Sequence, residues 1–320
     1  QDGDQQDGQQ QDGQQQDDQQ QDGQQQQQQD GDDDKPPQDY SEEYRRLLKI
    51  ALPKFKAPAH RLLEKVWRLT MKAKVNVMLI GPAGAGKTML AEQLATLCNL
   101  PYAEVSCSEG MSESHLVGRS LPVDGGAFKY FDSPLVENVQ RPSVSLIDEV
   151  DAADANTLLI ITSLTANGRM FIPQRIGAPI VKRNPLAAII AAANTTGSGG
   201  NEQHIGRNIL DGATLDRYYT LAVDYDLNYI KSLFNRSGKG IRKSPSWKPS
   251  MPLNDAEMLE LGEWHMNLMD KVAKTGISRI VATRFANHVV DATNAGIPLD
   301  EAKADLTLAF SADEKRRLGL

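Results

Sequence analysis

Residues 81–88 read GPAGAGKT, a pattern suited to binding a chain of phosphates. Glycines let the backbone turn so that its N–H groups face phosphate oxygens, and a following helix points its positive end the same way. Lys87 would add an ammonium group at the terminal phosphates, and Thr88 a hydroxyl for Mg²⁺. A simple glycine-rich turn is the alternative, but the complete spacing between a strand and a helix favours phosphate binding. The predicted contacts are Gly81, Pro82, Ala83, Gly84, Ala85, Gly86, Lys87, Thr88 and Met89.

Two adjacent carboxylates, Asp148 and Glu149, follow the apolar run SVSLI. A carboxylate at the end of a buried strand beside a phosphate loop can hold Mg²⁺, and its neighbour can polarise an attacking water molecule. The same acids, with Asp151 close behind, could instead cap a helix. The phosphate loop upstream favours the catalytic interpretation, which assigns the metal to Thr88 and Asp148 and the base to Glu149.

Asn194 ends another apolar run, LAAIIAAAN. An amide at that position could orient the attacking water, whereas its alternative role is to begin the turn NTTGSGG. The order of phosphate loop, acidic pair and asparagine favours the functional role. We therefore predict ATP and Mg²⁺ as ligands, with Glu149 and Asn194 in the hydrolytic site.

Short apolar runs alternate with helix-period segments between about residues 60 and 225, which predicts an α/β domain with a parallel sheet in three αβα layers. From residue 226 only helix-period segments follow. We predict a Gln/Asp/Gly-rich disordered tail at 1–40, a nucleotide-binding domain at 41–225 and a helical lid domain at 226–320. The five expected strands are 75–80, 102–107, 143–148, 186–194 and 218–225.

The composition narrows the class of protein. The formal net charge is −7, but residues 1–34 hold 11 of the 42 acidic residues, which leaves 31 acidic against 35 basic residues elsewhere. That weakly basic balance is little evidence for nucleic acid. No apolar run is long enough to span a membrane, and the first residues do not resemble a signal peptide. Cys98 and Cys107 are expected to be reduced core residues, so we predict a cytoplasmic location.

Together these motifs resemble the AAA+ ATPases over about residues 58–295. The segments CSEGMSESHLVGRS and GGAFKYFDSPLVENVQRPSVSLIDEVD are similar to one branch, in which a hairpin is inserted into the second helix. That branch contains the MoxR proteins, the CbbQ proteins, the cobaltochelatase small subunit CobS and the magnesium-chelatase motor. The resemblance places the helix halves at 112–117 and 134–140, with the insert at about 119–131. A second hairpin is expected at about 170–183.

The resemblance also implies roles for residues outside the motifs. The insert faces the central pore of a ring, which makes Phe128, Lys129 and Tyr130 candidate contacts with a partner protein; packing of the aromatic rings on a neighbouring helix is the alternative. Within GATLDRYYTLAVDYD, Arg217 would act on the γ-phosphate held by the neighbouring subunit, with Arg207 as the second choice. Arg284, in VATRFANHVV, would couple the lid to the nucleotide. A surface ion pair is the ordinary alternative for each arginine.

The resemblance implies a homo-oligomeric ring, expected to be a hexamer, that hydrolyses ATP to remodel or activate a partner protein, with metal or cofactor insertion as one purpose. A motor subunit of a cobalt or magnesium chelatase is the first alternative. A nucleic-acid motor or initiator is the second alternative. The lack of an appended DNA-binding module in the sequence counts against it. A nucleotide-binding module without catalysis is the last, and it conflicts with the complete set of catalytic residues.

Overall fold

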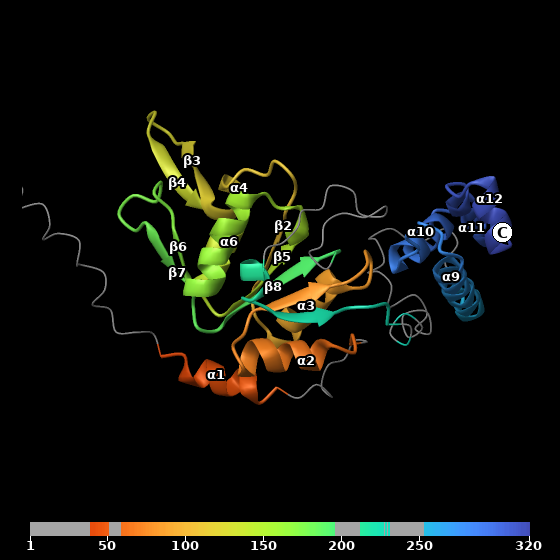
Figure 1. The fold of residues 1–320 in the computed structure, drawn as a ribbon, viewed down its shortest axis with the longest axis horizontal. Helices are drawn as coiled ribbons and strands as arrows, with labels where there is room; N and C mark the ends of the chain where they lie inside the picture. Colours follow the sequence, from red (N-terminus) through yellow and green to blue (C-terminus); the bar gives the residue numbers. More distant parts are fainter. Residues whose placement is uncertain (1–38, 51–58, 196–211, 227, 229, 231–252) are drawn as a thin grey trace, which may run out of the picture. The chain divides into compact units, whose positions relative to one another are not determined.

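The computed structural model describes residues 39–50, 59–195, 212–226, 228, 230 and 253–320 (Figure 1). The chain divides into two compact units, 1–42 and 43–320. The Gln/Asp/Gly-rich tract and Arg207 lie outside the described residues. Helix α1 (Ser41–Leu48) precedes the elements that carry the site.

Five parallel strands form the central sheet in the order β2-β5-β8-β1-β9. The predicted parallel α/β fold is therefore confirmed. Strand β8 is a central strand whose seven residues are all buried, which explains its composition of alanine and isoleucine alone. The five strands are β1 (Val77–Ile80), β2 (Tyr102–Ser106), β5 (Ser143–Asp148), β8 (Ala187–Ala193) and β9 (Tyr219–Ala222).

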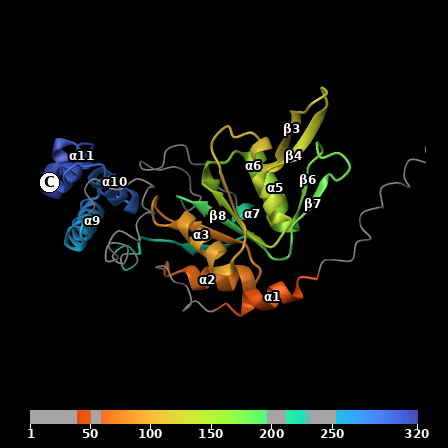
Figure 2. The ribbon, with the colours of Figure 1, turned by 180° about the vertical axis from the view of Figure 1, so that it is seen from behind.

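Helices cover both faces of the sheet, as Figures 1 and 2 show from opposite sides. Helix α2 (Leu63–Trp67), its π-helical continuation η2 (Arg68–Lys72) and α3 (Lys87–Cys98) lie on one face; α4 (Ser114–Val117), α5 (Pro134–Val139) and α6 (Ala155–Asn167) lie on the other. Helix α6 begins where the Asp154 side chain accepts a hydrogen bond from the Thr157 N–H and ends at Gly168, whose φ is 63°. A left-handed glycine is a common helix end.

The insert between α4 and α5 is a β-hairpin of β3 (Gly118–Pro122) and β4 (Phe128–Asp132). Gly118 is required where α4 turns into β3, because its φ is 120° and a Cβ atom there would lie 2.2 Å from the Phe131 carbonyl oxygen. A second hairpin pairs β6 (Arg169–Phe171) with β7 (Ile180–Lys182). The Arg175 guanidinium joins the two hairpins through an ion pair of 3.1 Å with Asp132.

The C-terminal part consists of α9 (Asp255–Thr275), α10 (Thr283–Asn294), α11 (Leu299–Thr307) and α12 (Ala312–Leu318). They share an apolar core that includes Leu261, Leu268 and Val289. Asn254 and Glu257 form a capping box at the start of α9. These four helices agree with the helix-period pattern predicted from residue 226 onward. A short helix, α7 (Gly212–Leu215), precedes β9.

Cys98 and Cys107 are both buried and free, as expected. Burial raises the pKa of each thiol to about 12, which keeps both protonated at neutral pH. Within the part of the chain that is described, no helix has the length and apolar character needed to cross a membrane.

His265 makes the helical core sensitive to acid. Its side chain in α9 is fully buried, and burial lowers its pKa to about 4. The unfolded chain, with a pKa near 6.5, takes up the proton first, so stability is complete above about pH 6.5 and is lost as the pH falls towards 4. We expect a loss of about 2 kcal/mol in unfolding free energy between pH 7.5 and pH 5 from this group.

Denaturant unfolding at both pH values, compared between the native chain and His265→Leu, measures that contribution. The difference between the two pH values should be smaller in the variant by the stated amount. An equal difference in both proteins would show that other groups cause the acid sensitivity.

Candidate functional site

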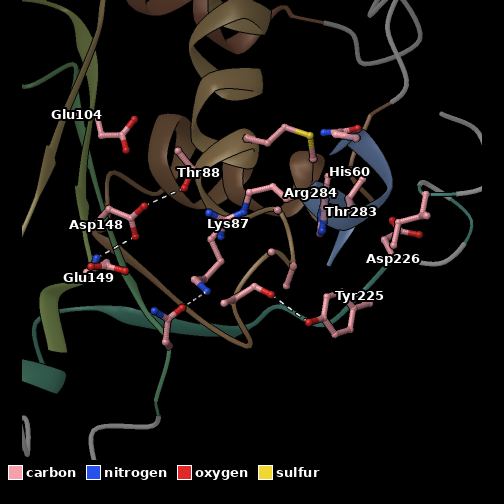
Figure 3. Close-up of a pocket in the computed structure, with 18 of the residues that line it drawn as sticks. His60, Lys87, Thr88, Glu104, Asp148, Glu149, Tyr225, Asp226, Thr283 and Arg284 are labelled. Atoms are coloured by element: carbon pink, nitrogen blue, oxygen red, sulfur yellow. Dashed lines mark hydrogen bonds between the residues drawn. The ribbon is translucent and has the colours of Figure 1, made fainter. Parts of the chain in front are cut away.

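A pocket of about 570 Å³ opens at the carboxyl edge of the sheet (Figure 3). The phosphate loop forms its floor, and the ends of β2, β5 and β8 and the start of α10 contribute to its walls. A Cβ atom on Gly84, whose φ is 77°, would lie 2.1 Å from the Ala282 side chain, so the loop and the residue before α10 are in close contact. A pocket of this size accommodates a ligand as large as a nucleotide.

Lys87 points its ammonium group into this pocket although its side chain is only 6% exposed. The Nζ atom donates to the carbonyl oxygens of Gly81 and Pro82, at 2.7 and 3.0 Å, and to Oδ1 of Asn194 at 2.8 Å. Lysine and asparagine, 107 positions apart in the sequence, therefore meet where the sequence analysis placed both. A buried cation facing a pocket is suited to binding an anion.

Thr88 and Asp148 meet on the opposite side of Lys87 from α10 (Figure 3). The Thr88 hydroxyl donates to Oδ2 of Asp148 at 2.8 Å. Two hard oxygen ligands suit Mg²⁺, which takes one or two protein ligands and completes its shell with water and phosphate oxygens. The described residues hold no group of three or more acidic, histidine or cysteine side chains that could cage a metal alone. The pair thus fits a Mg²⁺ ion that arrives with a polyphosphate.

Glu149 has a strained backbone, with φ 54° and ψ 36°. A residue other than glycine in this region costs about 1 kcal/mol or more, and such strain is concentrated at functional sites. Its N–H donates to Oδ1 of Asp148 at 2.8 Å, which holds the turn directly after β5. The second carboxylate therefore lines the pocket beside the first rather than continuing along the strand.

Asp151 fixes the end of β8, a role that the sequence analysis did not find. Its side chain is fully buried, and Oδ2 accepts hydrogen bonds from the N–H groups of Asn194 and Thr195 and from the Thr195 hydroxyl, at 3.2, 3.1 and 2.9 Å. The carboxylate considered above as a helix cap thus holds the backbone that carries Asn194. The only sign of this role in the sequence was an acidic residue two positions after Glu149.

The other half of the pocket is formed by residues that no motif predicted, including His60, Tyr225 and Asp226 (Figure 3). His60 is buried, and burial lowers its pKa, with nearby Asp226 opposing the shift. Asp226 accepts a hydrogen bond from the Arg61 N–H at 3.0 Å. The Tyr225 hydroxyl donates to the Ala83 carbonyl oxygen at 3.0 Å, and burial raises its pKa. Arg284 also lines the pocket.

Glu104 and Ser106 of β2 also line the pocket near Asp148. Burial raises the pKa of Glu104, while a hydrogen bond of 3.2 Å from the Tyr102 hydroxyl opposes that shift. Gly81 and Pro82 do not line the pocket themselves, but their carbonyl groups hold Lys87. Of the predicted loop contacts, those that line it are Ala83, Gly84, Ala85, Gly86, Lys87, Thr88 and Met89.

Arg217 lies away from this pocket, at the amino ends of the parallel strands, whereas the pocket lies at their carboxyl ends. Its carbonyl oxygen accepts a hydrogen bond of 3.2 Å from the Asn76 side chain, directly before β1, whereas the phosphate loop follows β1. A strand rises about 3.3 Å per residue, so the two edges are roughly 16 Å apart over residues 76–81. Arg217 therefore cannot contact a phosphate bound at the loop of its own chain.

The three insert residues differ in their surroundings. Phe128 is 75% exposed, and Lys129 is also exposed, with Nζ 5.7 Å from the centre of the Phe131 ring. The Tyr130 hydroxyl instead donates to the Val117 carbonyl oxygen at 2.7 Å. The Tyr130 side chain also packs against the apolar core around β5 and β8. Tyr130 thus holds the hairpin on the domain, while Phe128 and Lys129 face outward.

The comparison with known families agrees with this site. Residues 76–211 match the model of the AAA domain (dynein-related subfamily). The match supports an ATPase and includes the phosphate loop, the acidic pair and Asn194. Arg217 and Arg284 lie beyond the C-terminal end of the matched segment.

The chain is similar to uncharacterised staphylococcal proteins. An uncharacterised protein of Staphylococcus epidermidis is 28% identical over 169 residues, which are 51% of this chain and 61% of the relative. Among solved structures, a proposed ATPase of Cytophaga hutchinsonii covers 82% of this chain and 86% of its own, at 15% identity and a TM-score of 0.47. A closed state of Hsp104 with ATPγS and casein matches 70% of this chain and 44% of the Hsp104 chain, at 20% identity and a TM-score of 0.47.

Proposed function

We propose that the protein is an AAA+ motor that hydrolyses ATP. The observation that carries this proposal is the convergence of Lys87, Asn194 and the Thr88–Asp148 pair in one pocket beside Glu149. Lys87 and the N-terminus of α3 would bind the phosphates, with Arg284 on the facing wall. Mg²⁺ held by Thr88 and Asp148 would neutralise charge on the transferred phosphate. Release of phosphate from ATP by the full chain, dependent on Mg²⁺, tests this function.

Each hydrolytic residue has a separate role in this proposal. Glu149 accepts the proton of the attacking water molecule through its carboxylate. Asn194 lies beside Lys87 and holds the water in line with the terminal phosphate, while Asp151 keeps the Asn194 backbone in place. Because the Lys87 ammonium group already donates to three oxygens, binding of phosphate requires it to exchange at least one of these partners.

We propose a ring of identical subunits in which Arg217 completes the site of the next subunit. Its place at the sheet edge far from its own phosphate loop supports a contact in trans. An arginine delivered in this way is worth about a factor of 10³ or more in turnover. We expect Arg217→Ala to lower ATP hydrolysis about a thousandfold with little change in ATP affinity, while Arg316→Ala, an exposed arginine on α12, leaves both unchanged.

Mixing two inactive variants separates a contact in trans from any other role. Subunits with Arg217→Ala keep Glu149, and subunits with Glu149→Gln keep Arg217. Random assembly in equal amounts completes about one site in four, so roughly a quarter of the native activity should return. A mixture that stays as inactive as its components would contradict the contact between subunits.

The output of the motor is the remodelling or activation of a partner protein, as in the MoxR, CbbQ and CobS branch. The exposed insert residues Phe128 and Lys129 support a contact with such a partner, because an exposed aromatic ring beside a cation is suited to gripping a polypeptide. Tyr130, bonded inward, is left out of this contact. A chelatase motor remains the second candidate, supported by the same insert, and the hexameric stoichiometry and the cytoplasmic location remain predictions.

A further inference from the structure

The first hairpin presents an outward face that the nucleotide site does not use. Strands β3 and β4 pair so that Arg119 lies opposite Phe131 and Leu121 lies opposite Lys129. Paired residues of antiparallel strands share one face, and successive residues alternate between the two faces. The other face carries Tyr130, which packs on the core of the domain. The four residues named first therefore face away from the domain, and all of them are exposed.

The second hairpin has a face of the same kind. Its middle pair, Met170 and Val181, is buried in the core, so the two flanking pairs face outward. One of these pairs is cationic and the other is apolar. The outward residues, all exposed, are Arg169, Phe171, Ile180 and Lys182.

Both faces combine positive charge with apolar surface. Each holds two cations and two large apolar side chains, and none of the eight residues is acidic. Along β3 and along β6, a cation is followed two residues later by an apolar side chain, about 7 Å away. Asp124 lies in the turn beyond the paired strands. The hairpins lie side by side in both views, where the Arg175–Asp132 ion pair joins them and neutralises that aspartate (Figures 1 and 2).

The composition of these faces indicates what would cover them. Phe171 is 68% exposed and Phe131 is 41% exposed, and neighbouring apolar side chains in water are typical of an interaction site. The cations favour a partner with carboxylates and repel a basic one. Nucleic acid is less suitable, because the aliphatic side chains of Leu121 and Ile180 neither pair with phosphates nor stack on bases. An extended polypeptide repeats its side chains on one side at the spacing of β3 and β6, so it can offer acidic and apolar residues in alternation.

We propose that the outward faces of the two hairpins together bind an extended, acidic polypeptide segment. This inference rests on the proposed function, in which the insert contacts a partner protein, and it adds the second hairpin and the chemistry of that partner. Carboxylates of the segment pair with the cations, and its apolar residues cover the exposed apolar side chains. The contact residues are Arg119, Leu121, Lys129 and Phe131 of the first hairpin and Arg169, Phe171, Ile180 and Lys182 of the second.

Fluorescence anisotropy of labelled synthetic peptides, titrated with the full chain, tests the proposal without ATP turnover. The acidic probe consists of four repeats of Glu-Ser-Val-Ser. The basic probe repeats Lys-Ser-Val-Ser, and a third probe, Glu-Ser-Ser-Ser, keeps the charge but lacks the apolar residues. We expect the native protein to bind the acidic probe about tenfold more tightly than either of the others. Its affinity for the acidic probe should fall as the salt concentration rises.

Charge reversal on each hairpin identifies the surface that binds. Arg119→Glu with Lys129→Glu, and separately Arg169→Glu with Lys182→Glu, should each weaken binding of the acidic probe about fivefold or more. All four changes together should make the protein prefer the basic probe, a gain of binding that a damaged fold cannot produce. Arg45→Glu with Arg316→Glu is the matched control, because it alters two exposed arginines elsewhere and changes the net charge equally.

Three results would overturn the proposal. The first is the same loss of binding in the control as in the hairpin variants. The second is a loss confined to one hairpin, which would exclude a shared surface. The third is tighter binding of single-stranded oligothymidine than of the acidic probe, which would identify a nucleic-acid surface.

ATP hydrolysis by the same preparation separates this inference from the proposed motor. A chain that hydrolyses ATP but binds none of the peptides overturns the inference alone. A chain that binds the acidic probe as expected but does not hydrolyse ATP contradicts the motor and supports the surface.

Discussion

Glu149→Gln is expected to lower the rate of ATP hydrolysis about a thousandfold and to leave ATP bound. The amide keeps the size and shape of the carboxylate but cannot accept a proton from the attacking water, and general-base catalysis contributes about 10²–10⁴ to such reactions. Lys87 and Thr88, which would hold the phosphates and the metal, keep their contacts with Gly81 and Asp148. Phosphate release under saturating ATP measures the loss, and equilibrium binding of ATP measures what is retained.

A matched control for this variant is Glu137→Gln, since Glu137 lies on α5 and is exposed. It should hydrolyse ATP at the native rate. Equal losses of binding and turnover in Glu149→Gln would mean that the residue serves the fold of the pocket. The unusual backbone of Glu149 makes a comparison of thermal unfolding necessary, because glutamine must adopt the same conformation with φ near 54°.

Lys87→Ala is expected to weaken ATP binding by about a hundredfold or more. The change removes a buried cation whose ammonium group lies among the Gly81, Pro82 and Asn194 oxygens, and a charge-assisted hydrogen bond to phosphate is worth about 1.5–3 kcal/mol. Titration with ADP and ATP in the presence of Mg²⁺ measures the loss, which should be larger for ATP. Turnover should fall in parallel because the Asn194 amide also loses its partner.

Thr96→Ala provides the control for this variant, since Thr96 is exposed on the same helix and its hydroxyl donates to the carbonyl group of Glu92 in the preceding turn. Its affinity for ATP should match that of the native chain. Native affinity in Lys87→Ala would mean that the phosphates do not lie in this loop.

The sequence was sufficient for the residues that act in local patterns. A phosphate loop carries its backbone geometry and its lysine in eight consecutive residues, and an acidic pair after a buried strand reaches the same sheet edge because the strands are parallel. The insert was found for a different reason. Its two helix halves and its hairpin resembled a known arrangement, and the observed β3–β4 pairing lies within one residue of the expected segment.

The remaining half of the pocket could not be predicted, because its residues come from separate segments. His60, Tyr225 and Asn287 are single side chains without a repeated spacing, and only the tertiary fold places them beside the loop. Asp151 shows a different limit. Its proximity to Glu149 was visible in the sequence, but its bonds to Asn194 and Thr195 depend on β5 and β8 being neighbours in the sheet.

The phosphate loop and Arg217 lie at opposite ends of the parallel strands. The number of complete ATP sites would therefore depend on how many subunits assemble. Each chain would then carry the two halves of different sites and no complete one. An open row of n subunits has n − 1 complete sites, whereas closure of the row adds the last site without adding a subunit. Isolated chains would not hydrolyse ATP, and the rate of hydrolysis per chain would increase with protein concentration until the rings close.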